Sequence, residues 1–205
     1  MIPSPPCKFN DYNNIHCLKW YPTKKSVPPT PSSTTPQHPA SPSSPALVAT
    51  GASVRIYLIA RKSSEERSRI FIQELHAINP KAEIIWTEGE ISLLAETKRV
   101  CEVIKSRESR IDLLFLTTGY APFGARNETA EGIEITQSLV YYSRILFIQH
   151  LLPLLSAAEA PKIVSVQGGG LERTTVDLDD MDLKKSGDFG VVKTHVQYVS
   201  MNSTS

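Results

Sequence analysis

The most constraining feature of the sequence is a regular alternation of strand-like and helix-like segments from Arg55 onward. Short apolar runs typical of strands occupy residues 55–60, 82–86, 111–117 and 162–167, and a further short run covers 46–50. Between them, apolar residues recur at helical spacing in segments 63–78, 92–104 and 129–150. Strands that alternate with helices form βαβ units, which build a parallel sheet covered on both faces. The pattern therefore predicts an α/β fold with a Rossmann-like, doubly wound parallel sheet.

The N-terminal part of the chain has a different composition. Of the 15 prolines, 11 lie at or before Pro45, whereas all 10 glycines lie at or after Gly51. A segment rich in Pro, Ser and Thr buries too little apolar surface to offset the entropy of ordering. We therefore expect residues 1–45 to be a disordered leader and residues 46–205 to form one domain. The PxxP spacing from Pro36 to Pro45 also allows the leader to serve as a ligand for a partner domain.

Composition excludes several classes of function. The charges nearly balance, with 22 basic against 21 acidic residues, whereas nucleic-acid binders show a strong basic excess. No apolar run reaches the roughly 18 residues that span a bilayer, and the N-terminus lacks the apolar core of a secretory signal. We expect no nucleic-acid partner, no membrane and a cytoplasmic location. The 3 cysteines are too few for a disulfide framework or a zinc site, and the acidic run at 177–182 indicates a solvated loop, so no metal is predicted.

The strand pattern alone also indicates where a ligand would bind. In open α/β sheets, ligands lie beyond the carboxyl ends of the strands. These ends are followed by Thr50–Ser53, Arg61, Glu88–Ser92, Thr117–Tyr120 and Gln167–Gly170. We therefore expect the chemistry of the protein at these five segments.

Several of these segments resemble motifs of the short-chain dehydrogenase/reductase family, and most of all a divergent fungal subgroup that is often encoded with secondary-metabolite pathways. The likeness covers about residues 46–200. It is carried by Val48-Ala49-Thr50-Gly51-Ala52-Ser53, Ile59-Ala60-Arg61, Glu90-Ile91-Ser92, Leu114-Phe115-Leu116-Thr117-Thr118-Gly119, and the segment from Tyr141-Tyr142-Ser143-Arg144 to Leu155.

The resemblance implies an NAD(P)-dependent oxidoreductase that acts on a small-molecule carbonyl or alcohol, here within fungal secondary metabolism. It also implies a set of cofactor-binding residues: Thr50, Gly51, Arg61, Glu90, Thr118 and Gly119. A basic residue at the end of the second strand favours the 2′-phosphate of NADP, whereas an acidic one favours NAD. Arg61 therefore indicates NADP.

The first departure from the family pattern is the glycine-rich loop. Only Ala52, Ser53 and Val54 stand between Gly51 and Arg55, whereas a crossover between parallel strands needs about a dozen residues. The phosphate cradle also needs glycines and a helix N-terminus. Local geometry predicts instead a tight antiparallel hairpin over 46–60. Either way, the cradle is missing.

The second departure concerns catalysis. In the family, a Tyr passes a proton to the substrate, a Lys four residues later lowers the pKa of that Tyr, a Ser orients the carbonyl, and an Asn helps the proton relay. Here Gly168 stands at the Ser position, and Val140 or Tyr141 at the Asn position. No Tyr-x-x-x-Lys spacing occurs near the C-terminus, where His195 and Tyr198 are the only acid–base candidates. The chain also ends at Ser205, before the family's closing strands.

Three hypotheses follow from these observations. In the first, the chain is by descent a reductase of fungal secondary metabolism that cannot turn over as written. In the second, it is a non-catalytic remnant or interaction module that keeps part of the Rossmann sheet. In the third, an exon boundary between Ser53 and Val54 was misjudged, and the natural protein keeps its glycine loop.

Overall fold

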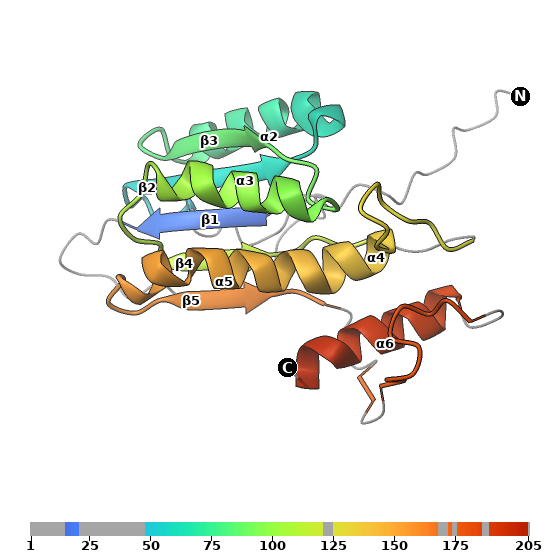
Figure 1. Cartoon of the computed structure of the whole chain (residues 1–205). Helices are drawn as coiled ribbons and strands as arrows, with labels where there is room; N and C mark the ends of the chain where they lie inside the picture. Colours follow the sequence, from blue (N-terminus) through green and yellow to red (C-terminus); the bar gives the residue numbers. More distant parts are fainter. Residues whose placement is uncertain are drawn as a thin grey trace, which may run out of the picture.

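A computed structural model describes residues 15–20, 48–120, 125–167, 172–173, 176–185 and 189–204. Its centre is a five-stranded sheet with the strand order β3-β2-β1-β4-β5 (Figure 1). The strands are β1 (Ile15–Trp20), β2 (Val54–Ala60), β3 (Glu83–Glu88), β4 (Leu113–Leu116) and β5 (Lys162–Ser165). β2 pairs with β3, and β4 with β5, in parallel. The predicted α/β class is confirmed, and four of the five strands match predicted segments.

The central strand comes from the leader and runs in the opposite direction to the others. β1 is antiparallel to both β2 and β4, with Ile15 opposite Ile59 and Leu116. The expectation of disorder throughout residues 1–45 is therefore wrong for residues 15–20, and the rest of the leader lies outside the described residues. The sheet is mixed rather than wholly parallel. β1 pairs with the facing edges of both β2 and β4, so neither edge is left open.

The predicted hairpin over 46–60 is also absent from the described part of that segment. Val48 is helical and is followed by a turn, in which Gly51 N–H donates to the carbonyl of Val48 (3.2 Å). Gly51 has a φ of +69°, a left-handed conformation that glycine adopts without a steric penalty. The strand expected at 46–50 is thus wrong for residues 48–50. β1 takes the place beside β2 that the hairpin would have used.

Helices cover both faces of the sheet, with α2 behind it and α3 and α5 in front in Figure 1. The short helix η1 (Lys62–Ser64) leads into α2 (Glu65–Ile78), which follows β2. α3 (Leu94–Lys105) follows β3. A continuous helical segment then comprises α4 (Ile135–Gln137), the π-helical turn η2 (Ser138–Tyr142) and α5 (Ser143–Ser156). The last helix, α6 (Val191–Thr204), packs beside η2. All three helices predicted by periodicity are present.

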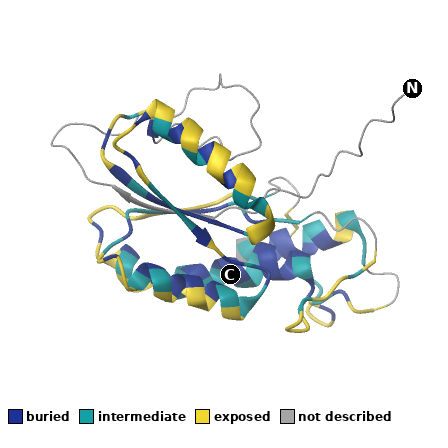
Figure 2. Ribbon diagram, turned by 90° about the horizontal axis from the view of Figure 1, so that it is seen from above, coloured by how far each residue is buried: buried dark blue, intermediate teal, exposed yellow. Residues whose placement is uncertain are grey.

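Strand alternation divides the interior into one cluster on each face of the sheet. On the α2 side, Val54, Ile56 and Leu58 of β2 pack with Phe71 and Leu75 of α2. On the other side, the same strand contributes Tyr57 and Ile59 to a cluster with α3 and α5, whose members include Val100, Cys101, Ile104, Phe147, Leu151 and Leu155. Figure 2, seen from above, shows the buried helix faces turned toward the sheet. β2 is therefore covered on both faces, as its nearly continuous apolar sequence requires.

The segment Ile135–Ser156 is long and apolar enough to cross a membrane by length and composition. In the fold it is a core helix, because Phe147 and Leu151 are fully buried against the sheet and α3. By contrast, the edge strand β5 leaves apolar side chains uncovered. Ile163 is 44%, Val164 38% and Val166 47% exposed.

Candidate functional site

The carboxyl ends of β2, β3, β4 and β5 lie along one edge of the sheet, which we call the ligand edge. Arg61, Glu90 and Gly119 follow three of these ends. Thr50 and Gly51 do not join them, because they precede the amino end of β2. The seven residues of β2 span roughly 20 Å at about 3.3 Å per residue. Two of the six predicted cofactor-binding residues therefore lie at the opposite edge, and their placement at a strand's carboxyl end is wrong.

Just after β3, the backbone of Gly89 lies close against the core side chain of Val100. Gly89 N–H donates to the carbonyl of Ala60 (3.0 Å), so the pairing with β2 continues past β3. A Cβ atom at Gly89 would meet Cγ2 of Val100 at 2.9 Å, so this position requires glycine. Glu90 accepts a hydrogen bond from the Ser92 hydroxyl (2.7 Å). One carboxylate oxygen of Glu90 is therefore already hydrogen-bonded within the turn that contains it.

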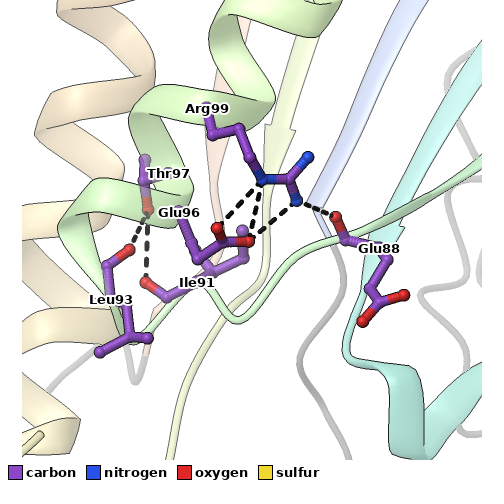
Figure 3. A network of polar contacts seen from close by, with 6 residues as sticks. All are labelled: Glu88, Ile91, Leu93, Glu96, Thr97 and Arg99. Atoms are coloured by element: carbon purple, nitrogen blue, oxygen red, sulfur yellow. Dashed lines mark hydrogen bonds and ion pairs between the residues drawn. The ribbon is translucent and has the colours of Figure 1, made fainter. Parts of the chain in front are cut away.

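A polar network ties the start of α3 to the end of β3 (Figure 3). Arg99 donates to the carbonyl of Glu88 (2.6 Å) and makes several bonds to the carboxylate of Glu96. Thr97 donates to the carbonyl of Leu93 (3.2 Å). The bond from Arg99 lowers the pKa of Glu96, even though partial burial opposes this shift. The network fixes the loop that carries Glu90.

The N-terminus of α3 already holds a carboxylate from a distant loop. Glu131 accepts hydrogen bonds from the N–H groups of Leu94 (2.6 Å) and Ala95 (2.9 Å). The Ser92 hydroxyl donates to Glu90 and does not cap the helix, whose capping position is Leu93. A helix N-terminus attracts anions. Here the anion is supplied by the chain itself.

At the end of β4, the two predicted residues differ in their accessibility. Thr118 is fully buried, and its hydroxyl donates to the carbonyl of Leu139 (3.0 Å). Its own carbonyl accepts from the guanidinium of Arg144. Gly119 is half-buried, with open space where a Cβ would stand. Gly119 is therefore the member of this pair that can face a ligand.

The two weak catalytic candidates lie on α6. Tyr198 is fully buried in a cluster with Val140, Leu183 and Met201. Burial, with a further contribution from the nearby Glu134 carboxylate, raises the pKa of its phenol. His195 lies one turn earlier and is half-buried. A buried phenol with a raised pKa is poorly suited to deliver protons to a substrate.

The acidic run at 177–182 is a structural loop, although it is less solvated than expected. Asp180 is only 7% exposed, and its carboxylate accepts from the N–H groups of Lys184 (2.8 Å) and Lys185 (2.9 Å). These bonds surround Leu183, which has a φ of 51° and a buried side chain. Among the described residues, no group of three or more acidic, His or Cys side chains could hold a metal.

Comparison with known proteins places this geometry in a family, although no family model matches the chain. Oxidoreductase AN1596 of Emericella nidulans is 38% identical over 149 residues, which is 73% of this chain and 43% of the relative. The short-chain dehydrogenase/reductase SAT2 of Stachybotrys chartarum is 32% identical over 133 residues, covering 60% and 37%. The chain thus spans about two fifths of the length of these relatives.

Solved structures agree on the fold. A metagenomic short-chain oxidoreductase in complex with NADP superposes with a TM-score of 0.55 at 18% identity, covering 77% of this chain and 64% of that one. A short-chain dehydrogenase/reductase from Burkholderia xenovorans gives 0.53 at 15% identity, covering 78% and 62%. This chain is a divergent, fungal-type short-chain dehydrogenase/reductase-like protein. The predicted family and its Rossmann-like fold are both confirmed.

The described residues at the ligand edge of this short-chain dehydrogenase/reductase-like chain do not fit a dinucleotide's diphosphate. That group needs a central strand whose carboxyl end leads into a glycine turn and a helix N-terminus. Here the central strand β1 is reversed, so its amino end lies at the ligand edge. Thr50 and Gly51 are at the other edge, and Glu131 occupies the N-terminus of α3. Of the six predicted cofactor-binding residues, Arg61, Glu90, Thr118 and Gly119 follow strand ends at the ligand edge.

One pair of residues in this chain has the same spacing as the family's Tyr-x-x-x-Lys. Phe189-x-x-x-Lys193 lies at the start of α6, with a phenyl ring in place of the phenol. Phe189 packs against the cluster around Tyr198, and Lys193 is exposed. A search that allowed Phe at the first position would have found this pair. A phenyl ring has no ionisable hydroxyl, so Phe189 cannot donate a proton.

Proposed function

We propose that this chain is an NADP-type oxidoreductase domain that recognises the adenosine 2′-phosphate half of the cofactor but does not carry out hydride transfer by itself. One observation carries the proposal. Arg61 follows β2 at the same edge at which Glu90 follows β3, whereas Thr50 and Gly51 lie at the opposite edge. This arrangement supports a site for one half of the cofactor, the half that carries the 2′-phosphate.

The chemistry of the assembled half suits a phosphate monoester. A guanidinium presents a planar set of donors that matches phosphate oxygens, and it stays charged at every physiological pH. Arg61 lies just before η1, and Ser64 N–H donates to its carbonyl (2.9 Å), which fixes the backbone at this point. The neighbouring Lys62 adds positive charge. These features support 2′-phosphate recognition.

The lack of turnover follows from the acid–base residues. Reduction of a carbonyl needs a proton donor at the substrate oxygen. Phe189 has no hydroxyl, and the Tyr198 phenol is buried beside the Glu134 carboxylate. By likeness to longer relatives that are named oxidoreductases, we propose for the whole protein a small carbonyl or alcohol substrate and a role in cytoplasmic secondary metabolism.

Binding of nucleotide fragments tests the proposal. Isothermal titration should show that 2′,5′-ADP binds and that 5′-AMP binds at least tenfold more weakly. Arg61→Ala should reduce 2′,5′-ADP binding by about tenfold or more, since hydrogen bonds to charged groups contribute roughly 1.5–3 kcal/mol. Arg69→Ala is the matched control, because Arg69 is an exposed arginine of α2 whose ion pairs are with Glu65 and Glu66.

Two results would contradict the proposal. NADP binding more than about a hundredfold tighter than 2′,5′-ADP would show that the diphosphate is held after all, as would NADPH oxidation above background with carbonyl substrates. Absence of all nucleotide binding would favour the second candidate function, a non-catalytic interaction module. The uncovered apolar side chains of Ile163 and Val164 on β5, and of Val166 just after it, support that candidate. Sequencing the transcript across Ser53–Val54 tests whether the natural protein carries a glycine loop.

A further inference from the structure

The π-helical turn η2 releases one backbone carbonyl for use by side chains. At the end of this turn, the N–H of Ser143 donates to the carbonyl of Ser138, five residues earlier, rather than to the carbonyl of Leu139. The carbonyl of Leu139 accepts instead from three side chains: the hydroxyl of Thr118 (3.0 Å), the hydroxyl of Ser143 (3.1 Å) and Nε of Arg144 (3.4 Å). The turn is thereby joined to the end of β4.

Arg144 extends the same connection to β5. Its Nη1 donates to the hydroxyl of Ser165 (2.6 Å) and to the carbonyl of Val166 (2.8 Å), and its Nη2 donates to the carbonyl of Thr118. Three elements, η2, β4 and β5, thus meet on one guanidinium. Each of these acceptors is a neutral oxygen, so the contacts depend on the planar fork of arginine rather than on an ion pair.

The burial of this side chain shows that it has a dedicated role. Arg144 is 2% exposed, and in the described part of the chain no carboxylate lies within ion-pair distance of it. Burial lowers the pKa of the guanidinium to about 10, so it still carries its charge at neutral pH. A buried cation without an acid is costly. An apolar side chain would fill the space with a smaller desolvation penalty, but it would make no hydrogen bonds to the ends of β4 and β5.

We propose that Arg144 is a positioning residue that holds the carboxyl ends of β4 and β5 in a fixed relation and so preforms this part of the ligand edge. The inference rests on the proposed function only in taking this edge as the place where a ligand binds. The segments it fixes are 117–120, which contains Gly119, and 165–167. Both begin where a strand ends, which is where ligands of open α/β sheets lie.

Hydrogen exchange followed by mass spectrometry on the whole protein tests this role. Arg144→Met should speed exchange in both 117–120 and 162–167 by about tenfold or more, measured relative to the slowest amides of β2, because it removes charge-assisted hydrogen bonds to both strands. Arg144→Lys should give an intermediate effect, since one ammonium cannot reach acceptors on three elements. Ser165→Ala should loosen 162–167 alone, and it keeps the test valid if Arg144→Met fails to fold.

Ile104→Val serves as the control for a general loss of stability. Ile104 is fully buried in the α3 side of the core and belongs to none of the three elements. This variant should raise exchange evenly without singling out the two segments. If Arg144→Met gives that even pattern, or leaves exchange unchanged, the inference is overturned. Because the measurement needs no nucleotide, its failure is distinct from a failure of 2′,5′-ADP to bind.

Discussion

Replacing Glu108 with glutamine is expected to destabilise the protein by about 2–3 kcal/mol. The Glu108 side chain is 1% exposed and accepts hydrogen bonds from Nη1 of Arg55 (2.9 Å) and from the hydroxyl of Tyr57 (2.8 Å). Arg55 also pairs with Glu83 (2.7 Å). This cluster lies at the amino end of β2, away from the ligand edge, so its effect on stability can be measured without disturbing the site.

The expected loss of stability depends on which partners each substitution leaves without a hydrogen bond or an opposite charge. Removing one partner of a buried ion pair costs about 3–5 kcal/mol, but Arg55 is partly exposed and keeps Glu83, which reduces the loss. Tyr57→Phe removes one hydrogen bond to a charged group and should cost about 1–2 kcal/mol. Burial, followed by the bond to Glu108, raises the pKa of the Tyr57 phenol, which agrees with a phenol that donates to a carboxylate.

Urea unfolding of the wild type, the two single variants and the double variant forms a double-mutant cycle. Because Tyr57 and Glu108 share a direct contact, the cycle should give a coupling of about 1 kcal/mol. Leu152→Ala is the matched control, since Leu152 is 52% exposed on α5 and should change stability little. Strict additivity of the two variants, or a loss below about 0.5 kcal/mol for Glu108→Gln, would refute the reasoning.

Two further predictions concern the core and the central strand. Burial raises the pKa of the Cys101 thiol to about 12 from an ordinary value of 9.0, so the unfolded chain ionises first and the free energy of unfolding should fall above pH 9. This group lowers the free energy of unfolding by about 1.4 kcal/mol per pH unit in that range. Urea titrations at pH 8–10 should therefore show a shallower fall with pH for Cys101→Ala than for the wild type. Equal pH slopes of the two proteins would contradict a buried thiol. Leu18→Pro should cost about 3 kcal/mol or more, because Leu18 pairs with both Ile56 and Leu113 and proline cannot donate in a central strand. Leu18→Val is its control, and an unchanged urea midpoint for the proline variant would show that β1 is not part of the sheet.

The sequence was sufficient for the elements that follow Arg55, because their apolar spacing is regular. α2 and α3 lie within one or two residues of the predicted limits, and β2 and β5 begin within one residue of theirs. β1 was not predicted because the leader was judged by its overall proline content. The stretch between Pro6 and Pro22, which contains β1, has no proline. Chain direction has no signature in a six-residue strand, so the reversal was not predictable from pattern.

The site was predictable where it depends on strand ends and not where it depends on distant contacts. The positions of Arg61, Glu90 and Gly119 at the ligand edge were predictable because these residues follow regular strands, and their role in cofactor binding stays a prediction. Thr50 and Gly51 were misplaced, because the resemblance put them after a strand that the structure does not form. The N-terminus of α3 is capped by the carboxylate of Glu131, which lies 36 residues after Ala95 in the sequence. A contact between residues so far apart leaves no local signal in the sequence.

The leader strand also affects the order in which the chain can assemble. Residues 15–20 leave the ribosome before their partners, because β4 begins almost a hundred residues later, at Leu113. Until then the strand has no second neighbour, and contacts between residues so distant in sequence form slowly. A nascent chain of this kind displays a strand with one unpaired edge until β4 emerges, which exposes it to chaperone capture or misassembly during translation.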